Sequence, residues 1–144
     1  MAFLDSLNIS GSGLTAQKYR MEIVAQNLAN ADTTRTEAGG PYRRKLVVLQ
    51  EIGSTGTFAQ ALRASSGASG GVRVLEVLDD TDDFKVEYDP THPDANEDGY
   101  VQLPNVDTTQ EMVDMMSASR LYEANVTAFN AMKAMATKAL EIGK

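Results

Sequence analysis

Two long stretches at the ends of the chain repeat apolar residues with the period of an α-helix. In residues 1–31, leucine or methionine recurs at every seventh position, and other apolar residues fall three or four positions away. Such spacing gathers side chains on one face and predicts an amphipathic helix that packs against another helix. The main residues of this face are Leu7, Leu14, Met21, Val24 and Leu28.

The second helical stretch, residues 105–144, has a clear predicted start. Asp107 is a good N-cap residue, and Gln110 follows three positions later, as in a capping box. A helix of about 35 residues is about 50 Å long and needs a partner helix from the same or a neighbouring chain. Its apolar surface is too wide for one seam, which predicts more than one neighbour. The residues expected at this interface are Met112, Met115, Met116, Tyr122, Val126, Phe129, Met132, Met135 and Leu140.

Small and polar residues interrupt both apolar faces. Gly11 and Gly13 each cost a helix interior about 1 kcal/mol relative to alanine, so we expect a weak N-terminal helix before residue 14. Ser12 is able to cap a shorter helix there. We also expect three asparagines at the interface, two to fix the register of the helices and one to end the first helix in a left-handed conformation, with ordinary exposure to solvent as the alternative for all three. These are Asn27 and Asn125 for the register and Asn30 for the helix end.

The middle of the chain, residues 32–104, changes to a β-type pattern. The predicted strands, each bounded by turn residues, span 42–52, 72–78, 84–88 and 100–103. A Gly- and Ser-rich segment at about 53–71 predicts a flexible loop. The predicted fold is therefore α+β. Helices from 1–31 and 105–144 pair as a coiled-coil-like assembly domain, and 32–104 forms a small antiparallel β-rich domain.

The charge distribution restricts the partners. The net charge is −7, of which the middle section contributes −6, the wrong sign for neutralising nucleic-acid phosphates. The one basic cluster, Arg43–Lys45, is interpreted as a solvated start of a strand. No apolar run approaches the length of a membrane span, so we expect no membrane insertion. The N-terminus lacks a cationic region followed by an apolar run, so we expect no cleaved signal peptide.

The residues needed for catalysis are scarce. The chain has no cysteine, and its single histidine, His92, sits in a predicted turn. A three-ligand zinc site or a histidine relay is therefore poorly supplied. Acidic pairs at 79–80 and 82–83 suggest the two carboxylates of a hydrolase, but acidic turn residues explain them more simply. We predict no catalytic residue and no cofactor.

One acidic loop resembles half of a metal site. Asp94, Asn96 and Asp98, followed by Gly99, match the first half of a calcium-binding EF-hand loop. The twelfth position would be Asn105 instead of the bidentate glutamate. A series of Asx turns is the alternative interpretation. A calcium-binding surface protein therefore stays open as a second function.

Several segments carry a family resemblance. Residues 12–33, and above all Asn27-Leu-Ala-Asn30, resemble the N-terminal signature of bacterial flagellar rod and hook proteins. Further segments make the chain similar to a proximal-rod member of this family over nearly its whole length, and a rod protein from another level stays open as an alternative. These segments are Pro41–Lys45, Tyr88–Val101, Glu111–Arg120 and Ala124–Asn130, together with Tyr122.

The resemblance implies a structural, non-enzymatic axial component of the flagellar basal body. Such a protein is exported by the flagellar type III apparatus and is built into a periplasm-spanning rod that transmits torque from motor to hook. The implied partners are other copies of itself, other rod proteins and the basal adaptor at the base of the rod. We expect the terminal helices to be only partly ordered in the free subunit and to become ordered on assembly, with the acidic central sheet projecting outward.

Overall fold

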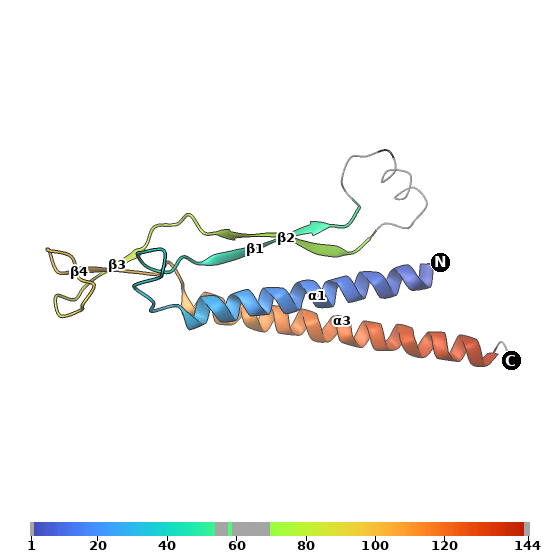
Figure 1. Cartoon of the computed structure of the whole chain (residues 1–144). Coiled ribbons are helices and arrows are strands. Elements are labelled where there is room, and N and C mark those ends of the chain that lie inside the picture. Colours follow the sequence, from blue (N-terminus) through green and yellow to red (C-terminus); the bar gives the residue numbers. More distant parts are fainter. Residues whose placement is uncertain (1, 54–57, 59–69, 143–144) are drawn as a thin grey trace.

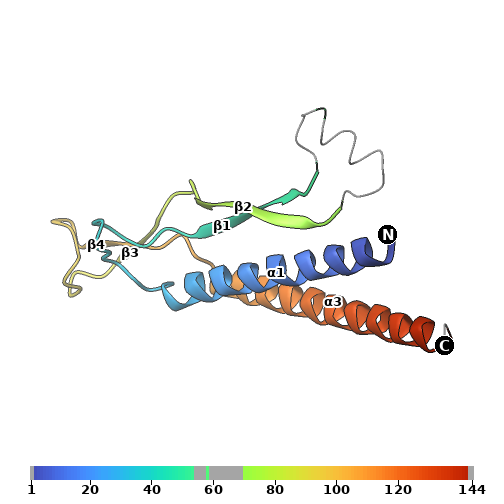
Figure 2. The ribbon, with the colours of Figure 1, turned by 45° about the vertical axis from the view of Figure 1, so that its right-hand side comes forward.

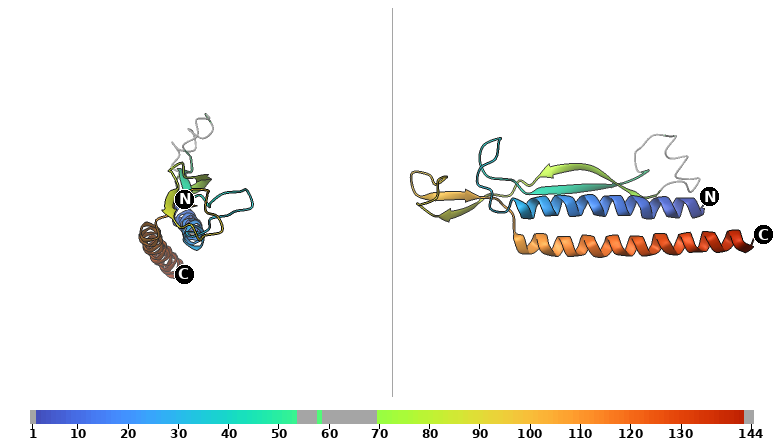
Figure 3. Two further views of the ribbon diagram at one scale, coloured as in Figure 1. Left: turned by 90° about the vertical axis from the view of Figure 1, so that its left-hand side faces the viewer. Right: turned by 60° about the horizontal axis from the view of Figure 1, so that its bottom comes forward.

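Two antiparallel helices and a β-hairpin form an elongated body. The structure is a computed structural model that describes residues 2–53, 58 and 70–142. Helix α1 (Ala2–Ala29) is the middle layer, with helix α3 (Thr108–Ile142) on one side (Figure 1). Strands β1 (Lys45–Glu51) and β2 (Val72–Asp79) follow the other side of α1 (Figure 3). The start of α1 and the end of α3 lie at the same end of the body (Figure 1). This arrangement confirms the predicted α+β class.

The strands form two separate antiparallel pairs. Strand β1 pairs with β2 in a register that shifts between Val48 and Leu49, which leaves Leu75 as the extra residue of a bulge. Strand β3 (Lys85–Tyr88) pairs with β4 (Tyr100–Leu103) beyond the start of α3, far from the termini (Figure 2). The central strands therefore do not form one sheet, and the outward projection of the central section in an assembled rod stays a prediction. The β1–β2 hairpin instead packs along α1, because a two-stranded ribbon needs another element to bury its apolar face. Most of the predicted loop at 53–71 lies outside the described residues.

The two helices are unequal in length and pair in one register. Asn27 bonds Glu111, and Gly13 lies against Asn125, so positions on the two helices advance one for one in opposite directions. Continuing this register places Ala2 opposite Ala136. The last residues of α3 therefore extend beyond α1, and Leu140 is 75% exposed.

Helix α1 is continuous through its glycines. The structure shows one helix from Ala2 to Ala29, although residues before 14 are expected to be weakly helical on propensity alone. The helix ends near Asn30, but no described residue other than glycine has a positive φ. The expected left-handed conformation of Asn30 is therefore wrong. Its side chain instead donates to Gln26 O at 2.8 Å and accepts from the Thr33 hydroxyl at 3.2 Å, which completes the helix end with side-chain bonds.

Helix α3 begins where the sequence predicts. Asp107 Oδ1 accepts hydrogen bonds from the backbone N–H groups of Thr109 at 2.9 Å and Gln110 at 3.3 Å. This confirms Asp107 as the N-cap. The capping box is incomplete, because the Gln110 side chain donates to Asp114 instead of returning to Asp107.

The cap makes a testable contribution to acid stability. The backbone N–H groups of Gln110 and Thr109 lower the pKa of Asp107 below its ordinary 3.8. A carboxyl whose pKa is lower in the folded state stabilises the fold above its unfolded-state pKa, and this stabilisation is lost as the pH falls through the folded-state pKa. We expect Asp107→Asn, which keeps a capping oxygen, to leave the urea midpoint at neutral pH nearly unchanged and to lose less stability on acidification. Urea titrations over an acidic pH series measure this, and an identical acid loss in both proteins contradicts it.

The chain exposes more surface than a compact monomer of its mass. Its accessible surface is 9918 Å², whereas about 7200 Å² is expected for a 15.5 kDa globular protein. Neither described helix combines the length and apolar character that crossing a membrane requires. Among the residues that the structure describes, the buried apolar core consists of small or medium side chains apart from one tyrosine, namely Ala16, Val24, Tyr42, Val101, Val106 and Ala118.

Candidate assembly interface

A cluster of buried polar side chains joins the two helices to the β1–β2 hairpin, at the end of the body where α1 ends and α3 begins. Asn27 is 1% exposed, and its Nδ2 donates to Glu111 Oε2 at 3.1 Å and to Lys45 O at 2.9 Å. Its Oδ1 accepts from Tyr42 Oη at 3.0 Å and from Lys45 N at 2.9 Å. Both donors and both acceptor sites of the amide are therefore used. One side chain of α1 thus contacts α3 and the start of β1 together.

Glu111 is the charged centre of this cluster. Its side chain is buried, and Oε1 accepts from Arg44 Nε at 2.6 Å. The Arg44 guanidinium also lies 3.4 Å from Asp80 and 3.6 Å from Asp114. We call Asn27, Tyr42, Arg44 and Glu111 the polar node. Because a buried carboxylate needs a paired charge and hydrogen bonds, this geometry fixes α3 against the start of β1.

The polar node shifts the titration of two of its members. Burial lowers the pKa of Arg44, but the hydrogen bonds and charges of Glu111 and Asp80 outweigh it, so the pKa is raised overall. Burial raises the pKa of Tyr42, and the carboxylates of Asp79 and Glu111 raise it further. The guanidinium therefore stays charged and the phenol stays a hydrogen-bond donor.

The structure corrects the interpretation of the basic cluster. Only 22% of the Arg44 side chain is exposed, so a solvated strand start is wrong for this residue. Arg43 also packs, with its guanidinium 4.3 Å from the centre of the Phe84 ring. No sequence pattern directly indicated the pairing of Arg44 with Glu111. The one available signal was Asn27, a polar residue on an apolar helix face, which predicts that a polar partner faces it.

The predicted interface residues fall into three groups by exposure. Val24 and Asn27 are buried. A larger group is half-buried between the elements and comprises Leu7, Leu14, Met21, Leu28, Asn30, Met115, Tyr122, Asn125, Val126, Phe129 and Met132. Four residues of α3 are exposed, namely Met112, Met116, Met135 and Leu140. The predicted face therefore divides into a part that pairs α1 with α3 and a part that the single chain leaves uncovered.

The uncovered part follows most of the length of α3. Met112, Met116 and Met135 are each more than half exposed, and Val113 and Leu121 add to the same helix. Large unbranched side chains exposed along one helix are typical of a surface that packs against another protein. Asn125 does not bridge the helices by its amide, since its Nδ2 donates to Leu121 O in its own helix. Its contact with α1 is instead the close approach to Gly13.

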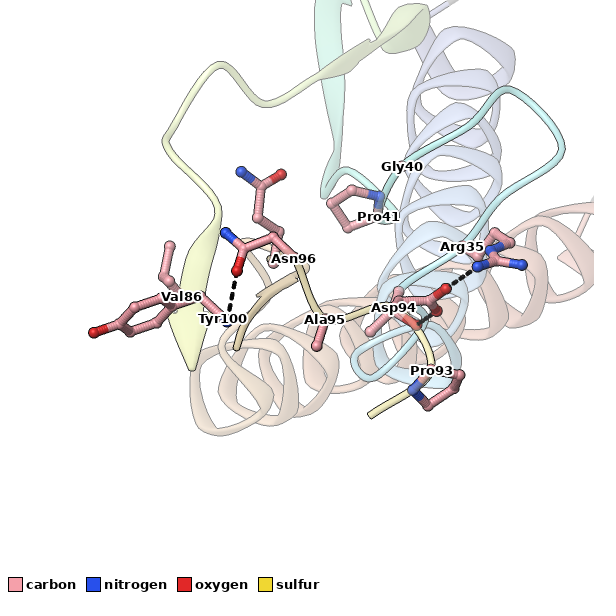
Figure 4. Close-up of a pocket in the computed structure, with 11 residues that line it drawn as sticks. Arg35, Gly40, Pro41, Val86, Pro93, Asp94, Ala95, Asn96 and Tyr100 are labelled. Atoms are coloured by element: carbon pink, nitrogen blue, oxygen red, sulfur yellow. Dashed lines mark hydrogen bonds and ion pairs between the residues drawn. The ribbon is translucent and has the colours of Figure 1, made fainter. Parts of the chain in front are cut away.

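A groove of about 730 Å³ lies at the far tip, between the loop after α1 and the turn before β4 (Figure 4). Asp94 lies within it and accepts hydrogen bonds from the Thr34 hydroxyl at 2.8 Å and from Arg35. The Thr34 bond, followed by the charge of Arg35, lowers the pKa of Asp94 against the opposing effect of burial. Asp94 thus ties the turn to the loop after α1.

The remaining residues of the acidic loop form turns. Asn96 Oδ1 accepts from the backbone N–H groups of Asp98 at 3.1 Å and Tyr100 at 2.8 Å. These are the bonds of an Asx turn, and with the bonds of Asp94 they use oxygens that a calcium ion would need. Among the described residues, no group of three or more His, Cys, Asp or Glu side chains is arranged to hold a metal ion. Nearby, His92 Nδ1 accepts from the Asp94 N–H, again within the turn.

Two segments of the chain match models of known protein families. The model of the family "Flagella basal body rod protein" matches residues 7–35, and that of "Flagellar basal body rod FlgEFG protein C-terminal" matches residues 97–142. Both matches fall mainly on the paired helices and on the segments that enter and leave them. They define the class of protein as a flagellar basal-body rod protein.

Curated relatives match over the full length. The chain is 53% identical to a flagellar basal-body rod protein FlgC of Bacillus subtilis, with both chains covered completely. It is 44% identical, again with complete coverage of both chains, to the FlgC protein of Escherichia coli O157:H7. The FlgC protein of Borreliella burgdorferi is 42% identical over 99% of this chain and 98% of its own. The chain therefore belongs to the FlgC family of flagellar basal-body rod proteins.

Proposed function

We propose that the chain is a structural subunit of the proximal rod of the bacterial flagellum and that it assembles through its terminal helices. In this role it forms part of the periplasm-spanning shaft that transmits torque from motor to hook. Its full-length similarity to proteins named FlgC supports this over a rod protein from another level. We infer that its partners are other copies of itself, other rod proteins, the basal adaptor and the flagellar type III export apparatus.

The observation that carries the proposal is the uncovered apolar surface of α3. Met112 and Met116, each about half exposed, lie in the first turns of α3, and Met135 and Leu140 lie near its end. Full burial of such a side chain is worth about 1.5–3 kcal/mol, and a monomer in water leaves the exposed share of this free energy unused. A subunit that is surrounded by neighbours recovers this free energy. The excess accessible surface of the chain agrees with this need for neighbours.

The paired helices and the polar node have separate roles in this proposal. The polar node fixes the positions of α1, β1 and α3 within one subunit, because its hydrogen bonds are satisfied inside the chain. The exposed residues of α3 are free to contact other subunits. In this proposal, a force applied to the helices is transmitted to the β1–β2 hairpin through the buried, charged polar node.

Met135→Asp tests the role of the exposed surface. Met135 is 61% exposed, so the aspartate meets water in the free subunit and leaves its stability nearly unchanged. In an assembled rod the same charge would be desolvated without a partner, so we expect loss of swimming and of incorporation into purified basal bodies. The matched control, Met135→Leu, keeps an apolar side chain and is expected to swim. Normal rods and swimming with Met135→Asp would contradict the proposal.

A further inference from the structure

The N-terminal half of α1 carries a run of small residues where the hairpin meets it. Ser12 Oγ donates to Ile9 O at 2.7 Å, within the helix. The same oxygen accepts from the backbone N–H of Val72 at 3.0 Å, at the first residue of β2. This hydroxyl therefore fastens the start of β2 to the side of α1.

Gly71 permits this close approach. A Cβ at this position would lie 2.6 Å from Ser12 Oγ, and the φ of Gly71 is +110°. A Cβ at Gly70 would lie 2.8 Å from Ile9 Cδ1. The backbone before β2 thus packs directly on Ile9 and Ser12, and a side chain at position 71 would have to displace the Ser12 hydroxyl and adopt a positive φ that side chains rarely adopt.

The two glycines beside Ser12 differ in what surrounds them. A Cβ at Gly13 would lie 3.1 Å from Asn125 Nδ2, so this glycine allows α3 to approach α1. A Cβ at Gly11 would meet nothing within 4 Å. Gly11 therefore weakens the helix by about 1 kcal/mol relative to alanine with no packing contact in return. Helix propensity is therefore low immediately before Ser12.

Serine at this position suits two incompatible structures. In the observed helix, Ser12 donates to Ile9 O, which requires residues 9–12 to be helical. As the N-cap of a shorter helix that begins at Gly13, Ser12 would leave the helical conformation and its oxygen would accept from the N–H of Leu14 or Thr15. The bond from Val72 depends on the first arrangement, because the oxygen is placed by the helix on both sides of it.

We propose that Ser12 is a latch that couples hairpin docking to the order of residues 2–11. With the latch closed, Val72 is bonded to Ser12 and α1 extends to Ala2. With the latch open, the start of β2 leaves α1, Ser12 caps a helix from Gly13, and residues 2–11 lose their helical structure together. The polar node at the other end of α1 holds residues 16–28 in both states. This inference concerns the free chain and goes beyond the proposed role in the rod.

Amide hydrogen exchange resolved by residue with NMR tests the latch. In the unmodified chain we expect residues 5–11 to exchange in one common opening that is faster than the exchange of residues 16–28. Gly71→Ala, which places a methyl group against Ser12 Oγ, is expected to accelerate exchange in 5–11 at least about fivefold and to leave 16–28 unchanged. The matched control is Gly39→Ala. Gly39 also has a positive φ, +86°, but a Cβ there meets no atom within 4 Å. This control is expected to leave 5–11 unchanged.

Gly11→Ala provides a change in the opposite direction. It strengthens the helix without a steric contact, so we expect about fivefold slower exchange in residues 5–11 only. Equal exchange of 5–11 and 16–28 in the unmodified chain would overturn the latch. So would acceleration of both segments to the same extent by Gly71→Ala, or no effect of Gly71→Ala on either. Because the measurement uses the free chain, these outcomes are distinct from a failure of rod assembly.

Discussion

Glu111→Ala is expected to lower the free energy of unfolding by about 3–5 kcal/mol, because it removes one partner of a buried, charged cluster. The substitution leaves Arg44 without its 2.6 Å bond and leaves the Asn27 amide without one acceptor. It also opens a space at a position that is 0% exposed. Urea unfolding followed by far-ultraviolet circular dichroism measures the loss.

Two further variants separate the charge from the shape of the side chain. Glu111→Gln keeps the volume and an acceptor oxygen, so we expect a smaller loss of about 1.5–3 kcal/mol from the weaker bond to Arg44. Glu123→Ala removes a carboxylate from an exposed site on the same helix and is expected to change stability by no more than about 0.5 kcal/mol. An effect of Glu111→Ala as small as that of Glu123→Ala would show that the polar node does not hold the elements together.

Leu14→Asp and Phe129→Asp are each expected to abolish swimming and to prevent incorporation into the basal body. Both residues are half-buried in the single chain. A carboxylate there disfavours the pairing of α1 with α3 as well as any further burial on assembly, since an unpaired charge loses its hydration. This double effect distinguishes these positions from Met135, where only assembly is affected.

Swimming in soft agar, together with immunodetection in purified basal bodies, measures the outcome. The controls are Leu14→Met and Phe129→Leu, which keep apolar side chains of similar size and are expected to retain swimming. Circular dichroism of the purified variants reports the loss of helix pairing independently. Cells that swim and carry normal rods with either aspartate would contradict an interface at these positions.

The sequence predicted the elements more fully than their arrangement. The seven-residue spacing and the Asp107 cap identified both helices, and the apolar runs identified the four strands to within a few residues. It did not show that the strands form two separate pairs or that β1–β2 follows α1. Alternation along a strand shows which of its faces is apolar, but it does not name the element that covers this face.

Local propensity was overruled at the start of α1. Gly11 and Gly13 predict a weak helix before residue 14, yet α1 is continuous in the structure. The contacts of Ser12 with Val72 and of Gly13 with Asn125 come from elements that are remote in sequence. These remote contacts, at the neighbouring Ser12 and at Gly13, stabilise a helix whose propensity is low at this point.

At the candidate interface, too, the sequence identified some of the residues and only the tertiary structure identified the others. Asn27 was identified from sequence because a polar residue stands out on an apolar helix face. Glu111 and Arg44 were not, because a glutamate in the first turn of a helix and an arginine before a strand are ordinary surface residues in a linear pattern. Only the fold brings Glu111 to Asn27, across 84 positions of sequence.

The sequence alone determined that this chain has two helices with apolar faces, β-strands between them and membership in a rod-protein family, since periodicity and local motifs are properties of neighbouring residues. The tertiary structure decided which apolar residues are covered within one chain and which stay on the surface of α3. It also decided that Glu111 is buried with Arg44. The physical reason is that burial depends on what packs against a residue, and those partners come from distant parts of the chain.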